Sequence, residues 1–577
     1  MKTRILLFII PLMVVAASCS VQKQTKTDIK KITKELDDNE ELEYYYVFIE
    51  ANRKKLLGDL NSALALFYQS LEINPQSAAA MSEIAQINEI IGNNETAVKY
   101  AKKAAETEPH NKWFQLKLAR LYINEQQYDN AIIVYNKLYE TNKKDLEIPY
   151  NLAALYRETD QFSKAIELYD EIEQKTGINE TLSLTKQRLY EQIGQKNKAY
   201  DEIKRLIKHY PNQPQYYGIL AEMYTNDNLF TIADENYQKL FEIDSSNALG
   251  QLSVIDFYRQ KIDYDNAFKY IRKVIYNQEI DFQSKAMVFI SMLHNPKELN
   301  IYFQQIEEHL LLLKDVYKDK KEAHTLYADY LIKMNKLEEA EIELRNIVDE
   351  FSVNPVVWEQ LLSIYSYQSK FNSLYTVSST AIDSFPKHAI FYLFKGISGI
   401  QIQKYKESLA ILKNGLNYVE NIPNLENDFY TYLGETYNEL KEYDKSDYYF
   451  DLVIKKDSAD LYVLNNYAYY LSLREDKLEY AEELSRKTIE AEPTNSTYLD
   501  TYAWILFKRR KYQDALYYIQ KAYDLGGYEN PEIVEHYGDI SYFTGNKEKA
   551  IKLWELAKDL GSTDKYLLLK IKTGKIK

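Results

Sequence analysis

The chain has 577 residues and a formal net charge of −14, with 27% charged residues, 14% aromatic residues and only 16 glycines, 12 prolines and one cysteine. The acidic balance argues against binding to nucleic acid or anionic lipid, because such a protein needs a basic patch to displace counterions. So few helix breakers over this length favour long helical runs.

Residues 1–18 have the three parts of a secretory signal: Lys2 and Arg4 at the charged end, an apolar run over 5–15, and small residues over 16–18. The apolar run is too short for a comfortable membrane span. Cys19, the only cysteine, follows at once, and Ala-Ala-Ser-Cys resembles the lipobox of bacterial lipoproteins. The resemblance implies cleavage before Cys19 and its acylation. The alternatives are ordinary signal cleavage or an uncleaved anchor.

The residues after Cys19 bear on localisation. An Asp at this place often means retention in the inner membrane of such lipoproteins, and this chain has Ser20 instead. The resemblance therefore implies the outer membrane. Residues 20–26 lack the acidic cluster that helps some lipoproteins reach the cell surface, so we expect the periplasmic face. The rest of 19–43 is polar and charged, as in a tether, and we expect it to become helical before Tyr44.

A period of 34 residues dominates the chain that follows. Seven alanines recur in register at this spacing: Ala63, Ala97, Ala131, Ala165, Ala199, Ala233 and Ala267. Within each period, apolar residues recur three or four apart in two stretches, which predicts two amphipathic helices. We expect the alanines where the paired helices cross, because a small side chain permits close approach there. Gly58, Gly92 and Gly194 are expected at the turn between the helices.

This pattern resembles the tetratricopeptide repeat, which has small residues at places eight and twenty, an aromatic at twenty-four and Pro at thirty-two. The resemblance covers roughly residues 44–560. It implies an all-α, right-handed superhelical solenoid of about 14–15 helix pairs. We expect an N-terminal array over 44–280 and a C-terminal array over 321–560.

Two segments depart from the repeat. Residues 281–320 lack the alanine signature, and they are either a degenerate repeat with a longer second helix or a hinge between two arms. Residues 561–577 form a short basic tail, which we expect to be an unpacked terminus.

The repeats leave no uncovered stretch of domain size, so we expect no enzyme and no cofactor. Neither a phosphate loop nor a nucleophile elbow occurs, and the one cysteine lies outside the repeats. The histidines show no metal-ligand spacing, and each is expected at an ordinary surface or loop position: His110, His209, His294, His309, His324, His388 and His536.

The last three repeats predict a candidate binding face. In the tetratricopeptide family, places five and nine of the first helix face the concave groove. Here these places recur 35 residues apart and hold Asn465, Asp500 and Glu535, then Tyr469, Trp504 and Asp539. An acidic strip beside two aromatics could hold an extended peptide. The alternative is that the aromatics only pack between repeats and the acids are solvated.

These features together predict a protein-interaction scaffold, held at the membrane by its lipid, that assembles or stabilises an envelope complex. Its expected partners are other envelope proteins or extended peptides, and not nucleic acid. The alternative function is a periplasmic peptide- or glycan-binding module that serves a separate enzyme.

Overall fold

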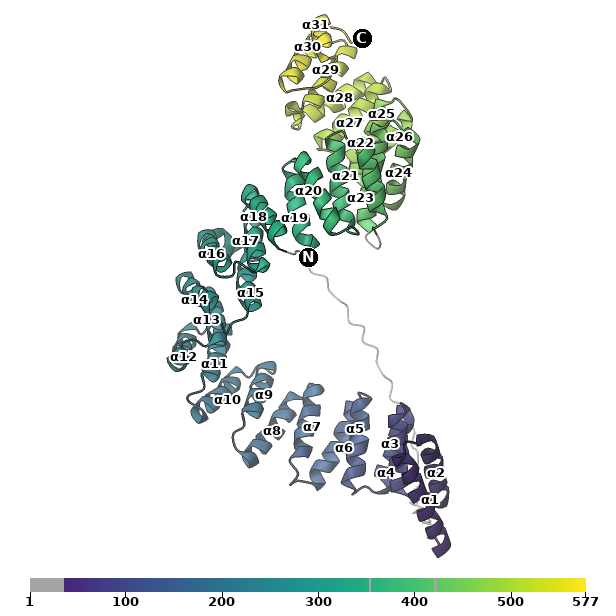
Figure 1. Ribbon diagram of the computed structural model, residues 1–577, viewed down its shortest axis with the longest axis vertical. Helices are drawn as coiled ribbons and strands as arrows, with labels where there is room; N and C mark the ends of the chain where they lie inside the picture. Colours follow the sequence, from purple (N-terminus) through teal and green to yellow (C-terminus); the bar gives the residue numbers. More distant parts are fainter. Residues whose placement is uncertain (1–35, 352–353, 420–422, 577) are drawn as a thin grey trace, which may run out of the picture. The chain divides into compact units, whose positions relative to one another are not determined.

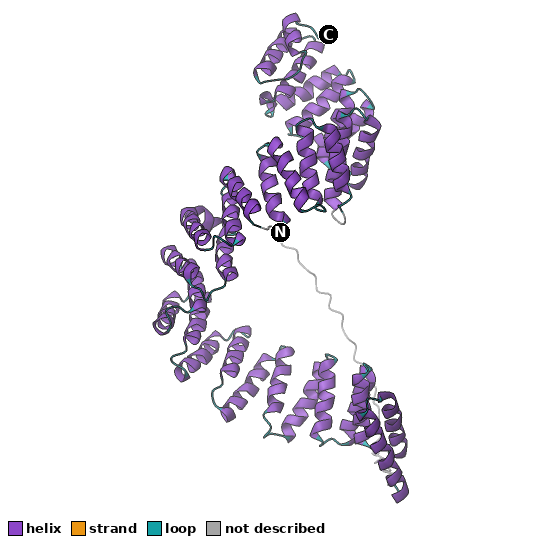
Figure 2. Cartoon of the chain, viewed as in Figure 1, coloured by secondary structure: helices purple, strands orange, loops and turns teal. Residues whose placement is uncertain are grey.

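The computed structural model describes residues 36–351, 354–419 and 423–576, and every regular element within these ranges is helical (Figure 2). The all-α prediction is confirmed. Thirty helices of the described chain form fifteen consecutive pairs, as predicted, and the short helix α31 follows them. Cys19, the signal 1–18 and the tether up to residue 35 lie outside the described residues.

The chain divides into two compact units, residues 1–250 and 251–577. The first unit contains six helix pairs, numbered in chain order (Figure 1). Their bounds are α1 Asp38–Leu56, α2 Leu60–Ile73, α3 Ala78–Ile90, α4 Asn94–Thr107, α5 Lys112–Asn124, α6 Tyr128–Thr141, α7 Glu147–Glu158, α8 Phe162–Thr176, α9 Glu180–Gln192, α10 Lys196–His209, α11 Pro214–Asn226 and α12 Phe230–Ile243. Each second helix also packs against the first helix of the next pair, from α2 on α3 to α10 on α11.

The boundary between the units falls inside α13, Ala248–Gln260. The second unit continues with α14 Tyr264–Tyr276, α15 Phe282–Leu293, α16 Pro296–Val316, α17 Lys321–Lys333, α18 Leu337–Glu350, α19 Pro355–Tyr367, α20 Phe371–Ser384, α21 Ala389–Gln401, α22 Tyr405–Leu416, α23 Pro423–Glu439, α24 Tyr443–Lys456, α25 Leu461–Leu473, α26 Leu478–Ala491, α27 Ser496–Lys508, α28 Tyr512–Asp524, α29 Pro531–Phe543, α30 Lys547–Asp559 and α31 Leu567–Thr573. A 3₁₀ turn, Gly527–Glu529, precedes α29.

Residues 281–320 lie inside the second unit, so the division of the chain does not fall at the hinge considered above. They hold α15 and α16, which pack on each other and on α17. The second helix of this pair is 21 residues long and departs from helical geometry at Tyr302, with φ −112° and ψ 25°. The segment thus has the form of a repeat with a lengthened, kinked second helix.

The turn within fourteen of the fifteen described helix pairs contains a residue with positive φ, and the turn between α15 and α16 is the exception. Gly58, Gly92 and Gly194 have φ of 80°, 80° and 71°, as expected for turn residues. At the same 34-residue spacing Gln126 and Asp160 adopt φ of 56° without being glycine. The left-handed residue therefore belongs to the geometry of the repeat, and glycine is its least strained form.

The seven in-register alanines are all fully buried, which confirms their predicted place between helices. In the second unit glycine provides some of these close approaches. A Cβ added at Gly396 would lie 2.3 Å from Leu412 Cδ2, and one added at Gly538 would lie 2.5 Å from Trp554 Cδ1. Both glycines are needed because a large side chain of the partner helix fills the space.

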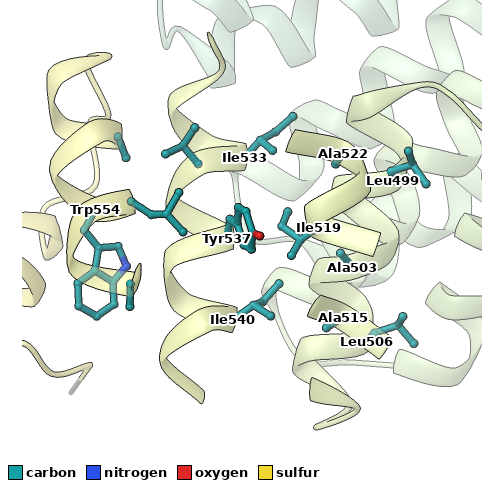
Figure 3. Packing of buried hydrophobic residues seen from close by; sticks show 14 of the residues in the cluster. Leu499, Ala503, Leu506, Ala515, Ile519, Ala522, Ile533, Tyr537, Ile540 and Trp554 are labelled. Carbon is teal, nitrogen blue, oxygen red and sulfur yellow. The ribbon is translucent and has the colours of Figure 1, made fainter. Parts of the chain in front are cut away.

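The apolar core at the C-terminal end is continuous across the last two helix pairs, α27 to α30, and the single helix α31. Figure 3 shows α29 between two layers, with Tyr537 and Ile540 facing Ile519 on one side and Trp554 of α30 on the other. Leu567 and Ile571 of α31 join this core. We expected an unpacked tail over 561–577, but its described residues 561–576 are packed, because apolar residues four apart bury one face of α31.

Candidate interaction site

A pocket of about 1110 Å³ lies at the C-terminal end of the second unit. We call it the C-terminal pocket. Its walls come from α25, α27 and α29 and from the segment 561–576, and its side chains include Tyr469, Trp504, Lys508, Glu532, Glu535, His536, Asp539, Tyr566 and Lys570. It thus combines aromatic rings with groups of both charges, a composition that suits polar peptide segments.

The structure brings four of the six predicted residues to this pocket. Tyr469, Trp504, Glu535 and Asp539 line it, because the 35-residue spacing puts them at matching places on α25, α27 and α29. Asn465 and Asp500 are buried and are not among the lining residues. None of the three predicted acids is solvated, since Asp500, Glu535 and Asp539 are all buried and paired.

A stacked pair of rings forms one wall. The rings of Trp504 and His536 lie 3.8 Å apart between centroids with an interplanar angle of 16°. His536 Nδ1 lies 3.0 Å and 3.1 Å from the two carboxylate oxygens of Asp500. Burial alone would lower the pKa of His536, but the charge of Asp500 and its hydrogen bond raise that pKa above its ordinary value. Asp500 thus fixes the orientation of the His536 imidazole, which stacks on the indole of Trp504.

A lysine from the C-terminal helix occupies the acidic part of the pocket. Lys570 Nζ lies 2.7 Å from Glu535, 3.0 Å from Asp539 and 3.2 Å from Asp564. Burial would lower the pKa of Lys570, but the charges of Asp539 and Glu535 raise it. Burial also raises the pKa of Glu535. The buried carboxylates therefore hold an ammonium group of the same chain, and α31 completes the pocket wall.

The open part of the pocket carries the remaining polar groups. Tyr469 donates a hydrogen bond from its hydroxyl to the exposed Glu532, and burial together with that carboxylate raises the pKa of Tyr469. Lys508 Nζ lies 5.1 Å from the centre of the Trp504 ring. Within the described chain, the buried Trp504 Nε1 has no hydrogen-bond partner. The exposed carboxylate of Glu532 could receive a basic side chain of a ligand.

Sequence reasoning missed His536 and Lys570. We had expected His536 at the surface or in a loop, but it is a buried residue of α29 that lines the pocket. Its position 36 residues after Asp500 could have suggested the contact, because neighbouring repeats are 35 residues apart here. Lys570 gave no such signal, since it lies beyond the last repeat.

Two other kinds of feature are absent from the described residues. No group of three or more His, Cys, Asp or Glu side chains there could hold a metal ion. None of the described helices has the length and apolar character required to cross a bilayer.

Residues 92–138, which span α4 to α6, match the family model described as Tetratricopeptide repeat. This stretch therefore carries the repeat, and further helix pairs precede and follow it in the described chain. No curated protein matches the sequence.

Several solved structures are similar to this chain. The APC/C hetero-tetramer Cut9–Hcn1 is 12% identical, with 92% of this chain and 96% of that chain covered and a TM-score of 0.36. Naa15/Naa10 bound to HypK-THB is 15% identical, with coverages of 92% and 93% and a TM-score of 0.36. Yeast Tom70 is 12% identical, with coverages of 93% and 95% and a TM-score of 0.29.

Proposed function

We propose that this protein is a lipid-anchored scaffold of a bacterial envelope, which assembles or stabilises a protein complex and carries out no reaction itself. A partner protein binds through a polar segment at the C-terminal pocket. The anchor is the acylated Cys19, and the array stands on the periplasmic side of the outer membrane. The signal-like residues 1–18 and the single cysteine support this part of the proposal.

The C-terminal pocket is the observation that carries the proposal. Its rings and charges come from consecutive repeats, so their spacing follows the array and suits an extended ligand. Tyr469 and Tyr566 present rings to the pocket, and Tyr566 is more than half exposed. Such aromatic side chains contribute most of the binding energy in many interfaces.

Replacing these two rings should release the partner without unfolding the array. We expect Tyr469→Ser with Tyr566→Ser to lower the recovery of crosslinked partner at least about tenfold, since two aromatic contacts are lost. The measurement is crosslinking in cells with the tagged full chain, detergent extraction and identification of the captured proteins by mass spectrometry.

Tyr448→Ser is the matched control, because Tyr448 is an exposed tyrosine on α24 that does not line the pocket. Partner recovery should be unchanged in this variant. Equal recovery from the pocket variant and the control would contradict the proposed binding site.

The anchor has its own test. We expect Cys19→Ala to abolish labelling with radioactive or clickable fatty acid and to shift the protein from the outer-membrane fraction to the soluble fraction. A Cys19→Ala chain that still takes up the label and still fractionates with the outer membrane would refute the lipid anchor. This result would leave the partner experiment untouched.

A further inference from the structure

The first helix of the array carries apolar side chains on two faces. On one face Tyr44, Val47 and Ala51 are buried, and they pack toward α2. On the other, five large apolar side chains are between 51% and 84% exposed: Leu42, Tyr45, Tyr46, Ile49 and Leu56. We call these five residues the α1 stripe. A surface helix normally has a single apolar face, so a second one indicates a second packing partner.

The stripe has the spacing of a helix-pairing seam. Leu42, Ile49 and Leu56 are seven residues apart, and Tyr45 and Tyr46 stand between the first two. Positions three, four and seven apart line up along one side of a helix, and this spacing lets two helices interlock over several turns. Four residues after Ile49, Arg53 lies on the same line, with its side chain 59% exposed and its guanidinium bonded to Glu50 of the same helix.

The next repeat shows what covers one position on this face. One period after Tyr46, Ala80 of α3 is fully buried and packs with Phe67 of the preceding helix α2. At α1 no described helix comes before it in the chain (Figure 1). Terminal repeats of a soluble solenoid usually end in a polar face, whereas this one ends in leucine, tyrosine and isoleucine.

The charges at the two ends of α1 favour a second copy of the same helix. The first turn holds Asp38, Glu40 and Glu41, and the last turn holds Arg53, Lys54 and Lys55. In an antiparallel pair the acidic end of each helix lies beside the basic end of the other. A lipid surface fits less well, because the exposed Glu41 and Glu43 flank Leu42 and would meet anionic headgroups.

The stripe is also self-complementary in register. A two-fold axis at Ile49 sets Leu42 opposite Leu56 of the second copy, since each is seven residues from the axis. The same axis sets Tyr45 opposite Arg53, a pairing of ring and guanidinium. Such a contact uses one patch on both subunits and closes with two copies.

We propose that the protein forms a two-fold symmetric dimer in which the α1 stripe of one copy packs antiparallel on the α1 stripe of the other. This proposal does not rest on the C-terminal pocket or its partner. It joins two arrays at their first helices and so pairs two copies of every site that they carry.

Cysteine crosslinking of the full chain in its own membranes tests the register. Ile49→Cys should form a disulfide-linked dimer on oxidation, because the two copies of residue 49 face each other at the axis. Leu42→Cys should not link to itself, but a differently tagged Leu56→Cys chain expressed with it should link to it. The wild-type chain, with Cys19 as its only cysteine, gives the background.

Ile133→Cys is the matched control, because Ile133 is 67% exposed on α6 of the same unit and should give no dimer. Self-linking of Leu42→Cys would indicate a parallel pair and overturn the proposal. Absence of a dimer from Ile49→Cys, or its linkage only to another protein, would overturn it as well.

A charge on the stripe should separate the copies. We expect Tyr46→Glu with Ile49→Glu to raise the dimer Kd of the purified full chain about a hundredfold, measured by analytical ultracentrifugation in detergent. Circular dichroism should keep its helical signal, because both side chains are mostly exposed. Ile133→Glu should leave the Kd unchanged. A wild-type chain that sediments as a monomer throughout the concentration series would contradict the dimer.

Discussion

Lys186→Met should lower the stability of the first unit around α9 by about 3–5 kcal/mol, because it leaves buried carboxylates without their cation. Lys186 is completely buried, and its Nζ lies 2.7 Å from Glu173, 3.0 Å from Glu202 and 2.8 Å from Asp170. Arg205 stays near Glu173 at 2.9 Å but is itself partly exposed, so it replaces the ammonium only in part. Hydrogen exchange of the full chain, read over α8 to α10, measures the loss.

The contribution of Glu173 to stability should depend on pH in opposite ways in the wild type and in Lys186→Met. Burial would raise the pKa of Glu173, but Lys186 and Arg205 hold that pKa below its ordinary value. In the wild type the stabilisation from ionised Glu173 is therefore fully present above the ordinary pKa of glutamate. It is lost as the pH falls through the lowered pKa of Glu173. In Lys186→Met burial without the ammonium raises the pKa of Glu173, so protonation relieves the penalty. The difference in stability between the wild type and Lys186→Met should shrink as the pH falls toward 4.5, the ordinary pKa of glutamate.

Two further variants separate this mechanism from a general loss of a long side chain. Lys204→Met removes an exposed lysine that is 3.7 Å from Asp201 on the same helix. The free energy of opening measured by hydrogen exchange should change by less than about 0.5 kcal/mol in this variant. Adding Glu173→Leu and Glu202→Leu to Lys186→Met should restore most of the protection, because an apolar cluster needs no cation. If the triple variant is as open as Lys186→Met, the cost does not come from uncompensated charge.

The period of 34 residues was enough to predict the helix pairs because its cause is local. Each alanine marks a crossing that admits only a small side chain, and each pair repeats the same packing. The positive φ at Gln126 and Asp160 follows from that period and not from the residue type. The boundary at Gly250 could not be predicted, because it falls within a helix that keeps the repeat pattern.

The candidate site was predictable only where it follows the repeat. Tyr469, Trp504, Glu535 and Asp539 occupy matching places of successive first helices, so their spacing brings them to one pocket. Lys570 was not predictable, since its helix lies outside the repeats and its docking depends on the tertiary core. The buried ion pairs of Asp500 and Asp539 show why an acidic column in a sequence does not by itself indicate a solvated or a ligand-binding face.

Trp554→Ala should lower the stability of the last helix pair and of the pocket wall by about 3–5 kcal/mol, because it leaves a cavity in a well-packed core. Trp554 is completely buried between α30 and α29, opposite the Ile519 side of the core (Figure 3). Its Nε1 donates to Asp539 at 2.8 Å, and Asp539 also accepts from Lys570 of α31. Hydrogen exchange over 531–576 should therefore rise together in α29, α30 and α31. Trp113→Ala, at a ring 72% exposed on α5, should change little.

A double-mutant cycle with Gly538 identifies the contact that carries this cost. Ala normally stabilises a helix relative to Gly by about 0.5–1 kcal/mol. Here Gly538→Ala should instead destabilise the wild type, because the new Cβ would lie 2.5 Å from Trp554 Cδ1 and Nε1. In the Trp554→Ala background the same change should be neutral or stabilising, since the obstructing ring is gone. Additive costs for the two substitutions would contradict this packing and show that Gly538 is required for another reason.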